Sequence, residues 1–273
     1  MRIVSLCPSN TELVAYLGAN SQLVGIDNYS DWPAEVRELP RLGPDLDIDM
    51  TKVEALKPDL VLASLSVPGM EKNVDDLKQS GLPYVVLNPQ SLADIADDLL
   101  TLGDLMNKKE QASQVVDRYH RIIDDYRERS LAIEEKPKLY WEWWPKPVFT
   151  PGRKNWLTEI SAYAGAENIF RDRDCESVKT DWSDVVRRDP DHICLVWVGV
   201  DPHKVKREFV LNRTGADRLA AVQSKKIHLL EESLFCRPSP RLLTGLRKIA
   251  ALLHPEIFPA FQDEDPLLIE HDH

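Results

Sequence analysis

The centre of the chain, residues 91–136, decides its architecture and reads SLADIADDLLTLGDLMNKKEQASQVVDRYHRIIDDYRERSLAIEEK. It contains no proline, and its apolar residues recur at the three- and four-residue spacing of an amphipathic helix. Asn107 interrupts the pattern, which predicts one helix before it and a second helix over 108–134. At 1.5 Å per residue the second helix would be about 40 Å long, enough to cross a domain. We therefore expect two lobes joined by a helical rod.

Short apolar strands alternate with helices on both sides of this rod. Such alternation is typical of βα units built around a parallel sheet. The predicted fold class is therefore α/β, with two α/β lobes, mainly parallel sheets and a long connecting helix. The predicted boundaries are 1–90 for the N-terminal lobe, 91–136 for the connecting helices, 137–256 for the C-terminal lobe and 257–273 for a loosely docked or frayed tail.

The two halves share short pieces of sequence in the same order. AYLGA at 15–19 matches AYAGA at 162–166, and each piece ends a predicted helix. KPDLVL at 57–62 matches DPDHIC at 189–194, and each piece turns a helix into a strand. Two matches in the same order indicate an internal duplication. Two similar lobes on one rod predict a ligand cleft between them.

Composition excludes several classes of partner. The formal net charge of -11 argues against nucleic acid and against anionic membranes, both of which need clustered Lys and Arg. The four Cys show no short-range pairing, so we expect neither a zinc site nor a disulfide framework. The first six residues, MRIVSL, enter a strand pattern directly, without the apolar region of a secretory signal. This predicts a cytoplasmic protein as written, or an extracytoplasmic one if a leader has been removed.

No motif for catalysis or metal binding stands out. Asp45, Asp47 and Asp49 alternate, but Met50 and Leu56 stand where an EF-hand needs Gly and Glu. The sequence has no GxSxG, P-loop, GxGxxG or HExxH pattern. Nothing in the sequence places a His base beside Ser5 or Cys7. We expect a protein without catalytic residues, metal ligands or a required cofactor.

Aromatic residues gather in the loops that follow the predicted strands, where ligands bind in open parallel sheets. The segment WEWWPKP at 141–147 combines aromatic side chains with Pro and Lys and is typical of a ligand surface. Arg237 lies between a strand and the last helix, in a segment stiffened by two prolines, which suits a fixed donor to a ligand. The predicted ligand-binding residues are Tyr29, Trp32, Trp143, Trp144, Trp182, Phe235 and Arg237.

Five segments carry a resemblance to a known family: SLCPSNTE (5–12), YSDWP (29–33), EALKPDLV (54–61), GAENIF (165–170) and SPR (239–241). In these the chain resembles the helical-backbone (class III) substrate-binding proteins of ABC importers for cobalamin and iron-siderophores, and their cobalamin-binding branch most of all. The resemblance covers residues 2–254. It implies two α/β lobes on a long helix, a shallow cleft and limited hinge motion. It also implies that Tyr29, Trp182 and Arg237 contact the ligand.

The sequence departs from the family pattern at four positions. A second Trp of the first lobe falls at Asp45, and a cleft Asp falls at Ser233 beside Glu231 and Glu232. Two surface Glu that dock on the transporter fall at Thr51 and Arg188, with Glu54 and Asp184 close by. Because these docking acids and the signal peptide are missing, an ABC importer permease is expected as a partner only conditionally.

The function that follows from the resemblance is binding of a corrinoid, cobalamin or a related cobamide, by a monomeric, non-catalytic protein. A corrinoid has a large apolar face fringed by amides, which suits aromatic platforms with a few polar anchors. One alternative is an iron-siderophore or haem binder of the same fold. Another is a cytoplasmic enzyme or chaperone of cofactor salvage, which would need a reactive pair drawn from Cys7, Cys236 and Glu231.

Overall fold

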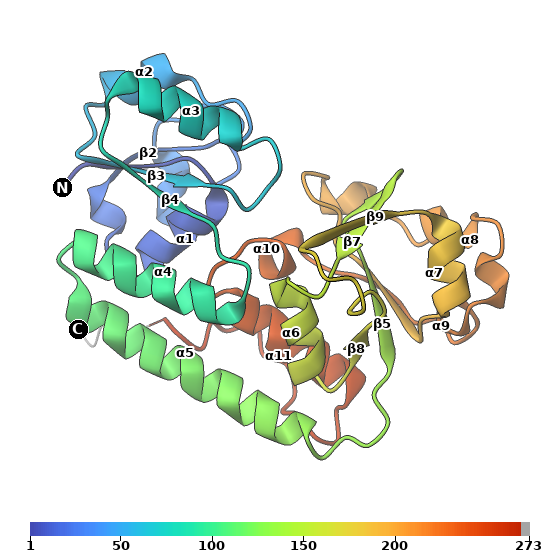
Figure 1. Cartoon of the computed structure of the whole chain (residues 1–273). Coiled ribbons are helices and arrows are strands. Elements are labelled where there is room, and N and C mark those ends of the chain that lie inside the picture. The colour runs from blue at the N-terminus through green and yellow to red at the C-terminus, as the bar shows by residue number, and fades with distance from the viewer. Residues whose placement is uncertain (269–273) are drawn as a thin grey trace. The chain divides into compact units, whose positions relative to one another are not determined.

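The computed structural model describes residues 1–268, and these form two compact units (Figure 1). The N-terminal unit comprises residues 1–120, 238–240 and 267–268, and the C-terminal unit comprises 121–237 and 241–266. Helix α5 (Lys109–Ser130) begins in the first unit and ends in the second. Both units are α/β, which confirms the predicted fold class. None of the helices within residues 1–268 combines the length and the apolar character needed to cross a lipid bilayer.

A four-stranded parallel sheet forms the centre of the N-terminal unit, in the order β2-β1-β3-β4. Val61 and Leu62 in β3 are fully buried, as expected for a strand with helices over both faces. Helices α1 and α4 cover one face, and α2 and α3 cover the other (Figure 1). The elements are β1 (Ile3–Ser5), α1 (Pro8–Tyr16), β2 (Leu23–Ile26), α2 (Met50–Ala55), β3 (Leu60–Ser64), α3 (Glu71–Ser80), β4 (Tyr84–Leu87) and α4 (Leu92–Leu105), with short 3-10 turns at Asn20–Gln22 and Ala34–Glu38.

The C-terminal unit contains a second parallel sheet, in the order β11-β10-β5-β8, and a small antiparallel sheet, β6-β7-β9. Its strands are β5 (Lys138–Glu142), β6 (Trp144–Pro145), β7 (Val148–Pro151), β8 (Glu167–Asn168), β9 (Ser177–Thr180), β10 (His192–Leu195) and β11 (Ile227–Leu229). Its helices are α6 (Trp156–Tyr163), α7 (Trp182–Arg188), α8 (Glu208–Leu211), α9 (Ala220–Gln223), α10 (Glu232–Phe235) and α11 (Leu242–Leu253), with 3-10 turns at Pro202–Lys204 and Ala216–Arg218. The antiparallel sheet was absent from the sequence prediction, because its strands are only two to four residues long.

The topology of the two parallel sheets agrees with the duplication. In each sheet the first strand in chain order lies between the second and the third, and the fourth lies beyond the third. The orders are β2-β1-β3-β4 and β8-β5-β10-β11. The two repeated turns also make the same hydrogen bonds. The Asp59 carboxylate accepts from the Arg2 backbone N–H at 2.7 Å, and the Asp191 carboxylate accepts from the Lys138 backbone N–H at 2.8 Å. The shared Pro-Asp pair therefore joins the third strand to the first in both units.

The repeated glycines and turn residues have matching backbone conformations. Gly18 and Gly165 both have positive φ, 61° and 74°, at the ends of α1 and α6. Lys57 and Asp189 both have positive φ, 48° and 43°, at the following repeated turn. Left-handed backbone is uncommon for residues other than glycine, so its recurrence at matched positions supports a common origin for the two units.

The central helical region begins as predicted and ends earlier. Ser91 and Asp94 form a capping box that starts α4, and Asn107 breaks the run with a φ of 57°. Helix α5 has 22 residues, which gives about 33 Å rather than 40 Å. The Ser-x-x-Glu spacing of Ser9 and Glu12 predicts a capping box that starts a helix at this point, and no such box forms. Helix α1 starts at Pro8, and the buried Glu12 carboxylate instead accepts a hydrogen bond from the Ser239 hydroxyl.

The C-terminal segment after α11, for which a loosely docked or frayed tail is expected, is attached to the protein by two buried side chains within residues 255–268. Phe258 is buried and stacks on Tyr126 of α5, with ring centroids 5.2 Å apart. Leu267 is also buried, and its carbonyl accepts from the Arg118 guanidinium at 3.0 Å. Residues 269–273 of the predicted tail lie outside the described residues.

Two histidines on neighbouring strands predict how stability depends on pH. His192 Nδ1 and His228 Nε2 lie 2.9 Å apart, between β10 and β11. Burial, and then the charges of neighbouring basic groups, lower the pKa of each ring from 6.5 to about 4. The unfolded chain therefore binds more protons than the folded chain between pH 6.5 and 4, so stability should fall as the pH is lowered through this range. We expect a total loss of about 2 kcal/mol, less than the two shifts would give if added, because solvent partly reaches the pair.

Urea unfolding at pH 7.5 and 5.0 checks this prediction. The variant His192→Gln/His228→Gln should lose less stability between the two pH values than the wild type does. His203→Gln, which changes an exposed histidine, serves as the control. Equal pH dependence in the wild type and the double variant would show that the pair plays no part.

Candidate functional site

The carboxyl edge of the N-terminal sheet carries buried polar groups that shape one loop. Asp27 follows β2 and is fully buried. Its carboxylate accepts the backbone N–H of Tyr29 at 2.6 Å and of Ser30 at 3.0 Å, and also the Ser30 hydroxyl. The Ser30 hydroxyl also lies 2.7 Å from Thr11 Oγ1. This network fixes the loop backbone and leaves the Tyr29 side chain 49% exposed, available to a ligand.

Trp32, in the same loop, packs against another aromatic side chain of its own unit. Its ring lies 5.3 Å from that of Tyr16, with the planes tilted by 37°. An aromatic pair of this kind stabilises the fold by about 0.5–1.5 kcal/mol beyond burial. Trp32 thus has a structural role, and its predicted contact with a ligand stays a prediction.

The carboxyl edge of the C-terminal sheet holds a small, mostly apolar cavity of about 140 Å³. It lies where β10 and β11 end, the position at which open α/β sheets bind ligands. The residues that line it are Leu195, Trp197, Val200, Val205, Leu229, Leu230, Glu231 and Glu232. Its two carboxylates are neutralised by cations of the same unit: Glu231 by Lys248 at 2.5 Å and Glu232 by Arg237 at 3.1 Å.

Glu142, the last residue of β5, has a fully buried carboxylate beside this cavity's Trp197. Arg213 binds it through both terminal nitrogens, at 2.5 and 2.8 Å. The Tyr140 hydroxyl donates to Oε2 at 2.7 Å, and the Trp197 indole N–H donates to Oε1 at 3.0 Å. Burial would lower the pKa of the Arg213 guanidinium, but Glu142 raises it above its ordinary value. Burial and the charge of Glu142 raise the pKa of Tyr140 well above its usual range, so its hydroxyl remains a donor.

Aromatic side chains form a row on the surface next to this carboxylate. The Trp197 ring lies 6.5 Å from that of Trp144 and 5.2 Å from that of Phe209. Trp144 is 43% exposed and Phe209 47% exposed, which is unusual for side chains of this size. We call Trp144, Trp197 and Phe209 the aromatic row. Such a row offers an apolar surface to a flat ligand.

The structure places the other predicted residues of the C-terminal unit in three different situations. Trp182 is half-buried at the start of α7, where its indole N–H donates to the Thr214 carbonyl at 3.1 Å. Trp143 is half-buried, and its indole nitrogen lies near the buried thiol of Cys236. Arg237 is nearly buried and ion-paired with Glu232.

Phe235 was wrongly predicted as a ligand contact. Its side chain is 0% exposed and packs against Trp141, with ring centroids 5.4 Å apart. The error has a simple cause, because Phe235 lies in α10, a short helix that the sequence does not reveal, and this helix turns the ring into the core.

Sequence reasoning missed Glu142, Trp197, Phe209 and Arg213. One signal for Glu142 was present: a carboxylate within an otherwise apolar strand requires a buried partner. The identity of that partner was not readable, because Arg213 lies 71 residues further along the chain. The apolar run 192–198 is typical of one buried strand that would include Trp197, whereas β10 ends at Leu195 and leaves Trp197 in the loop.

The thiols of Cys7 and Cys236, the two cysteines considered as nucleophiles, are unreactive in their surroundings. Burial raises the pKa of the Cys7 thiol to about 12 and that of Cys236 well above its usual value. Thiols in this state are not nucleophilic at neutral pH. Within residues 1–268 no group of three or more His, Cys, Asp or Glu side chains is arranged to hold a metal ion.

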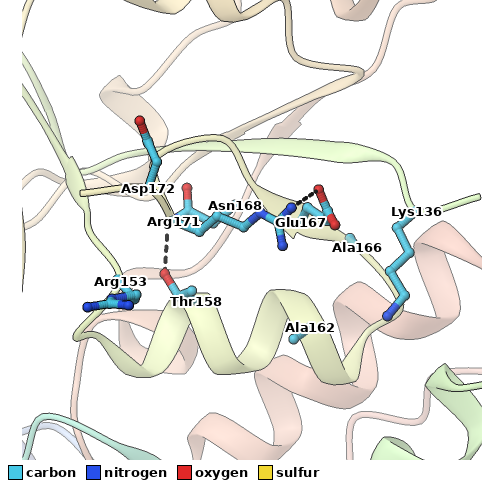
Figure 2. Close-up of a pocket in the computed structure, with 9 residues that line it drawn as sticks. All are labelled: Lys136, Arg153, Thr158, Ala162, Ala166, Glu167, Asn168, Arg171 and Asp172. Atoms are coloured by element: carbon cyan, nitrogen blue, oxygen red, sulfur yellow. Dashed lines mark hydrogen bonds and ion pairs between the residues drawn. The ribbon is translucent and has the colours of Figure 1, made fainter. Parts of the chain in front are cut away.

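A larger cavity, of about 530 Å³, lies in the C-terminal unit and contains none of the predicted ligand-binding residues. It lies between α6 and the segment around β8, as Figure 2 shows. Most of its charged groups are engaged: Arg171 with Glu167 at 3.0 Å, Arg153 with Asp174 at 2.7 Å and Asp172 with Arg188 at 2.8 Å. Despite its size, this open, charge-paired surface is a weaker candidate for an aromatic-lined ligand site than the strand edges.

The residues near the missing docking acids differ between the units. Glu54 is exposed on α2. Asp184, by contrast, is buried and engaged by Arg188 at 3.1 Å and by Arg187. Asp184 is therefore not a surface replacement for the acid that falls at Arg188.

Each of the two α/β units carries aromatic side chains at the carboxyl edge of its sheet, the edge at which open α/β sheets bind ligands. The chain belongs to the Periplasmic binding protein family, whose model matches residues 3–234. It is 29% identical over 262 residues to an uncharacterized ABC transporter substrate-binding lipoprotein of Bacillus subtilis, covering 94% of this chain and 81% of the relative. It is 27% identical over 248 residues to a vitamin B12-binding protein of Yersinia pestis, covering 91% and 84%.

Solved structures of the same fold bind different ligands. The periplasmic vitamin B12 binding protein of Vibrio cholerae matches with a TM-score of 0.77 and 24% identity, covering 93% of this chain and 96% of that one. A periplasmic heme binding protein from Pseudomonas aeruginosa matches with a TM-score of 0.81 and 21% identity, covering 97% and 96%. At these identities the match shows the shared fold.

Proposed function

We propose that this protein is a non-catalytic binding protein for a corrinoid, cobalamin or a related cobamide, and that it needs no other cofactor. The candidate contact residues are aromatic side chains at the carboxyl edge of a sheet, taken for each unit by itself: Tyr29 within the N-terminal unit, and the aromatic row within the C-terminal unit. The relation to a vitamin B12-binding protein at 27% identity supports this proposal. The proposed partner is the permease of an ABC importer, as the name of the Bacillus subtilis relative suggests.

The observation that carries the proposal is the charge balance beside the aromatic row. Arg213, Arg237 and Lys248 are each ion-paired with a carboxylate of the same unit, Glu142, Glu232 and Glu231. An anionic ligand would have to compete with these carboxylates for the three cations. A corrinoid offers an apolar face and neutral amides, so it needs aromatic contacts and hydrogen bonds rather than a cation. Charge pairing thus favours a corrinoid over an anionic siderophore or the propionates of haem.

The rival from another class is an enzyme or chaperone of cofactor salvage. Its candidate nucleophiles, Cys7 and Cys236, are buried thiols with raised pKa values. Glu231, its candidate base, is paired with Lys248. These surroundings support binding without catalysis.

Titration of the purified protein with cyanocobalamin, cobinamide, haemin and a ferric tris-catecholate tests the proposal. Calorimetry and the visible spectrum should both report binding of the two corrinoids, with weaker or no binding of the two anionic ligands. Absence of heat and of any spectral change with both corrinoids would overturn the proposal. Tight binding of haemin or the ferric tris-catecholate alone would favour the alternative of the same fold.

Replacing Trp144 by Ala should weaken cyanocobalamin binding by about 1–3 kcal/mol, because its exposed ring would lose its stacking contact with the corrin. The free energy of unfolding should fall by about 1 kcal/mol, since the side chain is 43% exposed and loses its contact with the Trp197 ring. Calorimetry and urea unfolding measure the two effects. Trp144→Phe, which keeps an aromatic face, is the matched control, and an affinity unchanged by Trp144→Ala would remove this residue from the site.

A further inference from the structure

The Glu142 carboxylate uses all of its hydrogen-bonding capacity on groups that come from three separate segments. Oε2 accepts from the Tyr140 hydroxyl at 2.7 Å and from Arg213 Nη1 at 2.5 Å. Oε1 accepts from Arg213 Nη2 at 2.8 Å and from the Trp197 indole at 3.0 Å. Tyr140 lies on β5, Trp197 follows β10 and Arg213 follows α8. One buried carboxylate therefore connects a strand with two loops.

Arg213 continues this network to a second indole. Its guanidinium carbon lies 4.6 Å from the centre of the Trp182 ring, the geometry of a cation–π contact. The next residue, Thr214, accepts the Trp182 indole N–H through its carbonyl at 3.1 Å. Arg213 thus contacts the face of the Trp182 ring, and Thr214 accepts the hydrogen bond from its indole N–H. Because Arg213 is bound at both terminal nitrogens, its guanidinium plane has little freedom to rotate.

The same carboxylate also fixes the centre of the aromatic row. Trp197 donates to Glu142 and lies between Trp144 and Phe209, with centroid distances of 6.5 and 5.2 Å. Trp197 is half-buried and packs against the core of its unit, and the bond to Glu142 also fixes the direction of its indole N–H. Ordering a ring that was free to rotate would reduce the affinity for a ligand. A carboxylate that holds Trp197 before the ligand arrives removes that part of the penalty.

We propose that Glu142 is a positioning residue, which orients Trp197 directly and Trp182 through Arg213 so that the ligand-facing aromatic surface of the C-terminal unit is preformed. The predicted effect of Glu142 on ligand affinity rests on the proposed binding function. Its predicted effect on the orientation of the two indoles does not. An ion pair that served only stability would need Arg213 alone. Here the Glu142 carboxylate also accepts the indole N–H of Trp197, whose ring is part of the aromatic row.

Fluorine NMR of protein labelled with 5-fluorotryptophan tests the positioning role without any ligand. The chain has seven Trp, and Trp182→Phe and Trp197→Phe assign the two resonances of interest. Glu142→Gln should shift or broaden both resonances, because an amide keeps the shape of the carboxylate and loses its charge. Asp172→Asn is the matched control, since it removes another carboxylate that binds an arginine through both terminal nitrogens, Arg188, in the same unit.

Calorimetric titration with cyanocobalamin gives the second readout. We expect Glu142→Gln to weaken binding about tenfold or more and Asp172→Asn to leave it unchanged. Unshifted Trp182 and Trp197 resonances in Glu142→Gln, or equal shifts in Asp172→Asn, would overturn the inference. If Glu142→Gln does not fold, Tyr140→Phe replaces it: this variant keeps the charge pair, removes one of the four hydrogen bonds and should shift the Trp197 resonance. If the wild type binds no corrinoid, the proposed function fails, and the two resonances still decide the positioning role.

Discussion

Replacing Arg213 by Met should lower the free energy of unfolding of the C-terminal unit by about 3–5 kcal/mol. The variant keeps much of the side-chain volume and leaves the carboxylate of Glu142 fully buried without its paired cation. Tyr140 and Trp197 still donate to it, but neither supplies a positive charge. A buried charge without a counter-charge is among the few single changes that destabilise a domain this strongly.

Urea unfolding, followed by hydrogen exchange of β5 and β10, measures the loss. The double variant Arg213→Met/Glu142→Gln should recover much of the stability, because it removes the uncompensated charge. Arg187→Met breaks the exposed side of an ion pair with Asp184 and should lose less than about 1 kcal/mol. A double variant less stable than Arg213→Met would contradict this explanation.

The fold was largely predictable because its signals are local and occur twice. The repeated AYxGA and Pro-Asp turns end helices and start strands in both units, and the two sheets have the same strand order. The short antiparallel strands were not predictable, since two residues such as Trp144 and Pro145 form a strand only through their neighbours. The capping box at Ser9 failed for a similar reason. Glu12 bonds to Ser239, more than two hundred residues away, and no local pattern reveals such a partner.

The residues that face solvent at the strand ends were only partly predictable. The segments after the parallel strands are expected to carry the ligand surface, and Tyr29 and Trp144, which follow β2 and β5, are 49% and 43% exposed. Phe235 went into the core and Phe209 emerged on the surface, because short helices decide which way each ring points. Arg213 was overlooked because its importance depends on Glu142 and Trp182, which lie far from it in the sequence. Tertiary pairing of this kind is absent from sequence spacing.

The amino-acid composition of the C-terminal segment does not reveal that the segment packs on the protein. Residues 255–268 are rich in Pro and acidic residues, which is typical of a tail that frays. Two buried apolar side chains counteract this: Phe258 stacks on Tyr126 of α5, and Leu267 is buried. Backbone carbonyls add to the attachment: those of Ile257 and Glu264 accept from Arg129 and Arg247 at 3.4 and 2.8 Å.

Replacing Phe258 by Ala should therefore lower the free energy of unfolding of the C-terminal unit by about 3 kcal/mol, since a buried aromatic ring stacked on Tyr126 is lost. Phe261→Ala is the matched control, because this ring is half-buried rather than buried, lies 5.4 Å from the Lys248 ammonium and should cost less than about 1 kcal/mol. Hydrogen exchange of α5 and limited proteolysis within residues 255–268 should both accelerate in Phe258→Ala. Equal cleavage of the wild type and both variants would mean that the segment detaches without help, and that its burial adds nothing to the stability of the unit.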